Sequence, residues 1–141
     1  MNPKEYKYTE EHEWICPEGG DRGKAGLTDY AQTQLGDLVY LDLPEPGTEV
    51  EQFKKMAEIE SVKAVADFFA PASGKVIEVN QDAIDDPAVV NQDPYGEGWL
   101  VELELSKPSE LDALMDSDKY DNFVAELEAE AEEEEPEEKE G

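Results

Sequence analysis

The chain has 141 residues, of which 38 are Asp or Glu and 11 are Lys or Arg, so its formal net charge at pH 7 is -27. This length suits one small domain with a modest core. An acidic surface repels nucleic-acid phosphates and anionic membranes, so we expect neither as a partner. No stretch approaches the roughly 20 apolar residues that a membrane span needs. Residues 1–6 lack the apolar core of a secretion signal, and we expect a cytoplasmic monomer.

The charge pattern separates an expected domain from an expected tail. Residues 126–141 contain ten glutamates and one lysine, a net charge of -9. Like-charge repulsion and Pro136 predict disorder over residues 132–140, after a stretch that can extend a helix. We therefore expect a folded domain over residues 1–125 and an acidic, disordered tail over residues 126–141. The tail would keep the chain in solution, steer it toward basic partners or adapt it to high salt.

Short strands broken by glycine and proline dominate the first part of the chain. Strand-forming runs lie at Glu13–Cys16, Lys24–Leu27 and Leu38–Leu43. Between the second and third runs, Thr28 is suited to cap a helix over Asp29–Leu35 that ends at Gly36.

A tight hairpin is predicted next. Residues Met56–Glu60 alternate between apolar and polar side chains, and Val65–Phe69 is rich in strand-forming residues. The connection between them is short, so Lys63 should lie at the hairpin tip. A lone lysine is most often a solvated charge. A tip, however, projects its side chain into solvent from a fixed base, which suits a lysine that a modifying enzyme must find.

The second half predicts further strands at Gly74–Val79 and Trp99–Leu105. The polar segment Asp82–Asn91 predicts a loop with a helical turn. Ser109 is suited to cap a helix over Glu110–Met115, and another helix is expected to start at Ser117 or Asp118. Many short strands with glycine and proline turns indicate a mostly β fold, a small sandwich or flattened barrel.

The residue types favour a protein that is not itself an enzyme. One histidine and one cysteine leave little room for a nucleophilic triad. The usual zinc-ligand spacing and the Walker-type phosphate loop are both absent from the sequence, and we expect no metal site.

Six blocks in a fixed order carry a family pattern. They are Tyr8–Trp14, Gly26–Gln32, Leu43–Gly47, Glu60–Ala64, Pro71–Gly74 and Asn91–Trp99. Together they resemble the lipoyl-carrier family, and within it the glycine cleavage H-proteins, over residues 6 to 123. The resemblance implies the lipoyl-carrier fold, a barrel-sandwich hybrid of two antiparallel sheets with short flanking helices.

By this resemblance, Lys63 carries lipoate through an amide on its side-chain nitrogen. The chain would shuttle the aminomethyl group of glycine between glycine decarboxylase, aminomethyltransferase and dihydrolipoyl dehydrogenase. A lipoate ligase or a lipoyl/octanoyl transferase would load Lys63.

The resemblance also assigns roles to three carboxylates, each with ordinary surface charge as the alternative. Glu60 would be recognised by the modifying enzyme. Glu13 and Asp67 would line the cleft in which the loaded arm rests. The chain departs from the family pattern at Gln34, where many relatives have a histidine, and this concerns how the arm is held rather than whether it is attached.

Two other functions stay open at this stage. A lipoyl relay protein would pass lipoate on to oxoacid dehydrogenase subunits and would show no activity with glycine decarboxylase. An unmodified acidic interaction module would tolerate Lys63→Ala. A biotin carrier is disfavoured, because Val62 and Ala64 flank Lys63 where such carriers have methionines.

Overall fold

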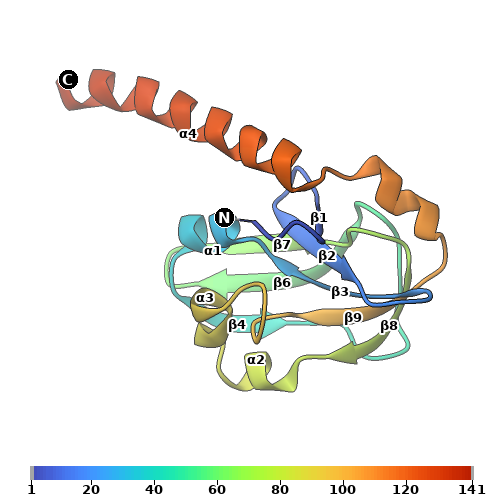
Figure 1. The fold of residues 1–141 in the computed structure, drawn as a ribbon. Coiled ribbons are helices and arrows are strands. Elements are labelled where there is room, and N and C mark those ends of the chain that lie inside the picture. Colours follow the sequence, from blue (N-terminus) through green and yellow to red (C-terminus); the bar gives the residue numbers. More distant parts are fainter. Residues whose placement is uncertain (1, 141) are drawn as a thin grey trace.

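Two antiparallel sheets form the body of the protein in the computed structural model, which describes residues 2–140 and the side chains of residues 2–131 (Figure 1). The larger sheet has the order β1-β2-β3-β9-β8-β5, and the smaller one has the order β4-β6-β7. The strands are β1 (Lys7–Tyr8), β2 (Glu13–Pro17), β3 (Arg22–Leu27), β4 (Leu38–Asp42), β5 (Glu49–Val50), β6 (Lys55–Ser61), β7 (Val65–Phe69), β8 (Gly74–Val79) and β9 (Val101–Leu105). The expected mostly β sandwich is confirmed.

The hydrophobic core lies between the two sheets. Alternate residues of the strands point inward, as expected for half-buried strands. Fully buried examples are Ile59 and Phe68 from the smaller sheet and Val76 and Leu103 from the larger one. At Gly74 the strands approach so closely that a Cβ would lie 2.1 Å from the carbonyl oxygen of Glu104, so only glycine fits there.

Short helices close the ends of the sandwich. They are α1 (Asp29–Leu35), α2 (Gln81–Asp85), α3 (Ala88–Gln92) and the 3-10 helix η1 (Pro108–Ala113). The predicted cap of α1 is confirmed, since the hydroxyl of Thr28 accepts a hydrogen bond from the backbone N–H of Ala31 at 3.2 Å. No helix in the described part of the chain is long and apolar enough to cross a membrane.

Two predictions for the second half were wrong in detail. The loop with one helical turn expected over residues 82–91 is instead two short helices, α2 and α3. Pro87 stands at the start of α3, where a backbone N–H would have no partner within the helix. It therefore separates two helices and does not prevent helix formation. Ser109 does not cap its helix, because η1 already starts at Pro108 and Lys107 occupies the cap position.

The last helix, α4 (Ser117–Glu140), begins where the sequence predicted and extends away from the body (Figure 1). Its first turns hold Tyr120, which is fully buried and stacks on Tyr8 with ring centroids 4.7 Å apart. The predicted disorder over residues 132–140 concerns residues whose side chains lie outside the described part, and it stays a prediction.

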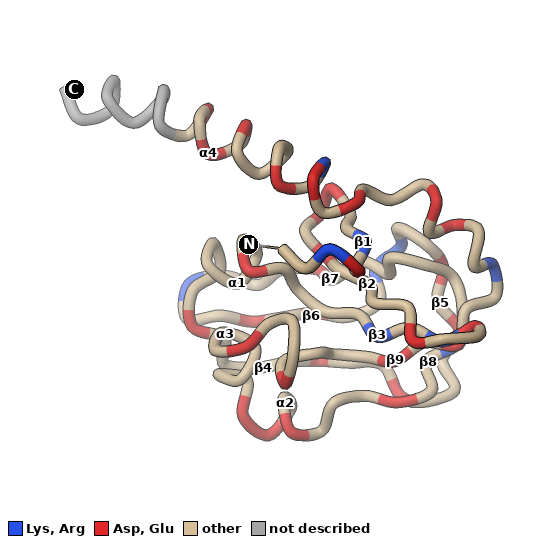
Figure 2. The backbone as a smooth tube through the Cα atoms, viewed as in Figure 1, with Lys and Arg blue, Asp and Glu red and all other residues tan. Residues whose placement is uncertain are grey.

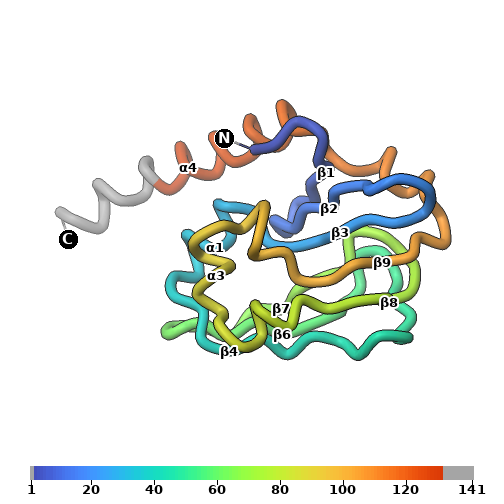
Figure 3. The backbone as a smooth tube through the Cα atoms, turned by 60° about the horizontal axis from the view of Figure 1, so that its bottom comes forward, coloured from blue at the N-terminus to red at the C-terminus, as the bar shows by residue number. Residues whose placement is uncertain are grey.

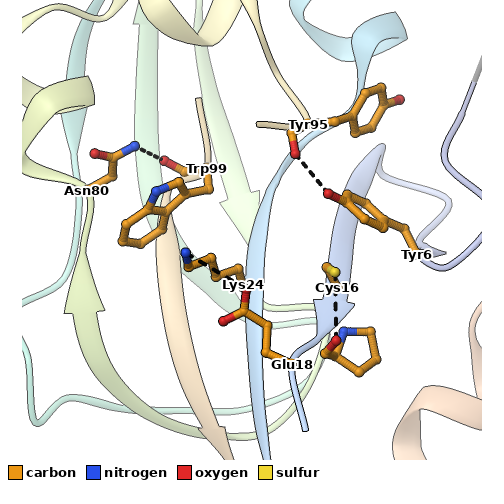
Figure 4. Close-up of polar contacts among 8 residues, drawn as sticks. Tyr6, Cys16, Glu18, Lys24, Asn80, Tyr95 and Trp99 are labelled. Atoms are coloured by element: carbon orange, nitrogen blue, oxygen red, sulfur yellow. Dashed lines mark hydrogen bonds and ion pairs between the residues drawn. The ribbon is translucent and has the colours of Figure 1, made fainter. Parts of the chain in front are cut away.

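Asp and Glu residues occur along most elements of the described chain, with few Lys or Arg residues between them (Figure 2). One lysine is held on the larger sheet. Figure 4 shows Lys24, whose Nζ lies 4.7 Å from the ring centroid of Trp99 and 3.8 Å from a carboxylate oxygen of Glu18. Asn80 donates a hydrogen bond to the carbonyl of Trp99 in the same region. Lys24 therefore lies against Trp99 and beside Glu18 on this face of the larger sheet.

Candidate functional site

The β6–β7 hairpin presents Lys63 at its tip, as the sequence predicted. The two strands pair from Lys55 opposite Phe69 to Glu60 opposite Val65, and residues 62–64 form the connection. Lys63 is exposed. Figure 3 shows the tip projecting from the end of the body that carries α1 and α3.

Ser61 fixes the backbone of the tip. Its side chain is buried, and its Oγ accepts hydrogen bonds from the backbone N–H groups of Lys63 at 3.2 Å and Ala64 at 3.1 Å. The backbone N–H of Ser61 also donates to the carbonyl of Ala64 at 2.8 Å. Serine favours such local turns, so the signal was present in the sequence, but we did not assign Ser61 a role from it.

A second tether joins the tip to the loop before β4. The N–H of Val62 donates to the carbonyl of Asp37 at 3.0 Å. That loop is held in turn by Asn91 of α3. The Asn91 side chain accepts from the N–H of Leu38 at 3.0 Å and donates to the carbonyl of Gly36 at 2.9 Å. The tip is therefore positioned from three separate parts of the chain.

The Lys63 side chain passes close to Gly36. Its Cε lies 3.7 Å from the position that a Cβ at residue 36 would take. Gly36 has a φ of 80°, which L side chains rarely adopt. Glycine thus ends α1 and leaves room beside the lysine.

A cleft of about 390 Å³ lies between α1 and the free edge of β7. Its lining is mostly apolar, with polar groups at the rim. The lining residues are Glu11, His12, Leu27, Tyr30, Ala31, Gln34, Leu35, Ile59, Ala66, Asp67 and Phe69. Leu35 is the neighbour of Gly36, and Ala66 lies three residues beyond Lys63, so the cleft begins beside the lysine.

Asp67 lies among the residues that line this cleft, as expected. Its side chain is 46% exposed and its carboxylate lies 3.3 Å from Nζ of Lys55, which also binds Glu58 at 2.5 Å. The hydrogen bond with Glu58, and to a smaller extent the contact with Asp67, holds the pKa of Lys55 above its usual value.

Glu13 is buried and does not line the cleft directly. One carboxylate oxygen accepts a hydrogen bond from the N–H of Phe69 at 3.2 Å, and the other pairs with the hydroxyl of Thr9 at 2.5 Å. Burial raises the pKa of Glu13 to about 7, although both hydrogen bonds act in the opposite direction. Glu13 thus caps the free edge of β7 and reaches the cleft only through Phe69. Of the two carboxylates that the resemblance placed in the cleft lining, only Asp67 lies there.

The remaining predicted residue, Glu60, is exposed on the outer face of the smaller sheet. It has no ion pair within residues 2–131. His12 has a structural role, because its Nδ1 lies 2.8 Å from the hydroxyl of Tyr120 and burial lowers its pKa.

The arrangement suits a group carrier. Among the described residues no set of three or more His, Cys, Asp or Glu side chains could hold a metal ion. A fixed, exposed amine beside a mainly apolar cleft can instead bear a long acyl arm and shelter part of it.

Comparison with known proteins agrees with this geometry. Residues 6–127 match the family described as Glycine cleavage H-protein. The Glycine cleavage system H protein of Symbiobacterium thermophilum is 52% identical over 124 residues, which cover 88% of this chain and 96% of the relative. Glycine cleavage system H protein 2, mitochondrial, of Arabidopsis thaliana is 46% identical over 126 residues, covering 89% and 80%.

A solved structure shows the same fold. The crystal structure of a glycine cleavage system H protein from Mycobacterium marinum superposes with a TM-score of 0.79 at 37% identity, covering 88% of this chain and 99% of the other. The family match spans most of the chain, and the relatives are matched over nearly their full length. The chain therefore belongs to the glycine cleavage H-protein family and is a non-catalytic lipoyl carrier of the glycine cleavage system.

Proposed function

We propose that Lys63 is the residue to which this carrier's lipoyl group is attached. The observation that carries the proposal is the tip itself, where an exposed lysine projects from a backbone fixed by Ser61 and by the Val62–Asp37 hydrogen bond. H-proteins work with glycine decarboxylase, aminomethyltransferase and dihydrolipoyl dehydrogenase, and a ligase attaches their lipoate. A single anchored lysine beside a cleft meets the needs of such a shuttle.

The residues around Lys63 fit the lipoyl group. When bound, lipoate supplies a cyclic disulfide that can be opened, loaded and reoxidised. Lysine plus the acyl chain extends on the order of 14 Å. Asp67 follows Lys63 by four residues, which span at most roughly 13 Å even if fully extended, so the arm can reach it. Leu35 and Ala66 would hold the apolar stem on the way.

Different carboxylates would serve this site in different ways. Asp67, at the cleft rim, would accept a hydrogen bond from a cationic nitrogen carried on the arm. Glu13 would act as a positioning residue, because it fixes the backbone of Phe69 in the cleft wall. Glu60 would be recognised by the enzyme that modifies Lys63.

The extent and location of the carrier belong to the same proposal. Residues 1–125 would form the lipoyl-carrier domain and residues 126–141 an acidic tail, which is supported by a family match that stops at residue 127. A cytoplasmic location is supported by a composition with one cysteine and so no internal disulfide. Fractionation of host cells with an antibody to the chain would check it.

The first experiment is loading with a lipoate ligase, lipoic acid and ATP, followed by intact mass and peptide mapping. We expect one lipoyl amide, on Lys63. Lys63→Arg should prevent it, whereas Lys107→Arg, at another exposed lysine, should not. An unmodified chain under conditions that load another H-protein, or a lipoyl group on a different lysine, would disprove the assignment. Activity of the loaded chain in glycine–bicarbonate exchange then separates a glycine cleavage carrier from a relay protein.

A further inference from the structure

An apolar patch surrounds the base of Lys63 on the outer face of the smaller sheet. Five large hydrophobic side chains of the described surface are prominently exposed, and four of them belong to this patch. They are Val39 (49%), Tyr40 (56%), Val62 (68%) and Val65 (62%). The fifth, Phe53, precedes β6 and so lies at the opposite end of the hairpin.

The register of the sheet places Tyr40 and Val65 on the same face, with the Glu60 carboxylate between them. Tyr40 of β4 is opposite Glu60 of β6, which is opposite Val65 of β7. Directly opposed residues share one face, so these three side chains form a row across the sheet. Val62 joins the row to the tip.

A β-bulge adds to the patch. The pairing of β4 with β6 shifts between Leu38 and Tyr40, so Val39 and Tyr40 are both exposed although they are neighbours. In a regular strand one of them would point into the core. Bulges re-aim side chains in this way, often beside functional sites.

A row of carboxylates borders the patch. Asp42, Glu58 and Asp67 are opposed across β4, β6 and β7, two residues along the strands from the row of Tyr40, Glu60 and Val65 and on the same face. Lys55 is the one lysine paired with them in the described chain. A partner that covers this face would need an apolar centre with basic side chains opposite Glu60 and the carboxylate row.

We propose that this patch is the docking surface for the enzyme that acylates Lys63, and this inference rests on the proposed attachment at that residue. The acylating enzyme must bring its active site to Nζ itself, so it has to cover the side chains around the tip. Enzymes that use the far end of a loaded arm work on the order of 14 Å away and need not touch them.

A second copy of the chain fits this surface poorly. A twofold contact would place the same patch on both sides and would bring the carboxylate rows toward each other. At a net charge of -27 such a contact would be repulsive.

Acylation forms one amide bond on Lys63 and releases AMP. Lipoate and ATP form an acyl adenylate with release of pyrophosphate, and the lone pair of the neutral Nζ amine attacks its carbonyl carbon. A C–N bond forms as the C–O bond to AMP breaks, and the nitrogen gives up one proton to solvent. The patch contributes by holding the two proteins in register for this attack.

The test is the rate of loading of a Tyr40→Thr, Val65→Thr double variant by a lipoate ligase with lipoic acid and ATP, followed by intact mass. Threonine is a good strand former, so the sheet should persist, which circular dichroism and the unfolding midpoint check. We expect kcat/KM for loading to fall at least tenfold, mainly through KM, because buried tyrosines often dominate interfaces. Phe53→Asn, the control at the opposite end of the hairpin, should change it less than twofold, since asparagine tolerates the φ of 66° at this position.

A second readout uses chains loaded to completion. Reduction of the arm by NADH and dihydrolipoyl dehydrogenase should be equal in the double variant and the unsubstituted chain. Unchanged loading of the double variant, or an equal loss with Phe53→Asn, would overturn the docking surface while leaving Lys63 as the attachment site. Failure of the unsubstituted chain to load on Lys63 would instead disprove the proposed function.

Discussion

Glu13 shows how strongly burial can raise the pKa of a carboxyl group. The sequence suggests a carboxylate that faces a loaded arm, but the structure buries it under the edge of β7, where it holds Phe69 and Thr9. Because a buried charge is costly, the neutral form is favoured and the pKa rises to about 7. A protonated carboxyl can donate one hydrogen bond and accept another, which this site allows.

This raised pKa predicts a pH dependence of stability. The folded state holds the proton of Glu13 up to about pH 7, whereas the unfolded chain releases it near 4.5. The contribution is therefore fully present below about pH 4.5 and is lost as the pH rises toward 7, a change of about 3 kcal/mol. Urea unfolding across this range should show it.

Glu13→Gln provides the comparison, since glutamine has the shape of the neutral acid and does not titrate. The difference in unfolding free energy between the unsubstituted chain and this variant should move in favour of the variant as the pH rises. Parallel pH profiles for the two proteins would show that Glu13 titrates normally.

At the scale of elements, the hairpin depends on helix α3. Asn91 holds the loop that ends α1, and that loop holds Val62 at the tip. Strands β6 and β7 alone would leave the tip free to move, because isolated hairpins are marginally stable. The site is thus built from elements far apart in the chain.

Asn91→Ala should loosen the tip. It leaves the N–H of Leu38 and the carbonyl of Gly36 without their partner, which should lower the free energy of unfolding by about 1–3 kcal/mol. Hydrogen exchange at the N–H of Val62 should accelerate by more than exchange at Ile59 in the middle of β6. Asn122→Ala, at an exposed position of α4, should change neither. Equal exchange at Val62 in both variants would show that the tip does not need Asn91.

For the molecule as a whole, the net charge of -27 opposes compactness. Residues 126–141 contribute -9, which leaves -18 on the rest. The folded body must overcome this repulsion through its core and through aromatic contacts such as Tyr8 with Tyr120. The boundary of the stable unit should therefore lie after Tyr120 and before the most acidic residues.

A chain that ends at residue 131 should fold as stably as the full chain, or more so by a few tenths of a kcal/mol at low salt. It keeps Tyr120 and Phe123 but loses seven glutamates and one lysine. Thermal unfolding at about 0.02 M and about 0.5 M NaCl should show the difference shrinking as salt screens the charges. A chain that ends at Lys119 should lose about 3 kcal/mol or more, because Tyr120 is buried. A large loss on removing residues 132–141 would contradict this boundary.

The sequence by itself determined the family and many of the local elements, including the hairpin and α1. Alternation in β6 and the strand-forming residues of β7 placed Lys63 at a tip, and Thr28 and Gly36 marked the two ends of α1. These features depend on neighbours within a few residues, where strand period and capping chemistry act. The ordered blocks gave the family because they span most of the chain.

Only the tertiary structure decided how the site is held and what surrounds it. The Asn91 tether, the burial of Glu13 against Phe69 and the exposed bulge at Val39 and Tyr40 all join segments distant in sequence. Local spacing cannot show which segments meet, or whether a carboxylate will be buried or solvated. Those outcomes follow from how two sheets and their covering helices pack around one core, which is a property of the whole chain.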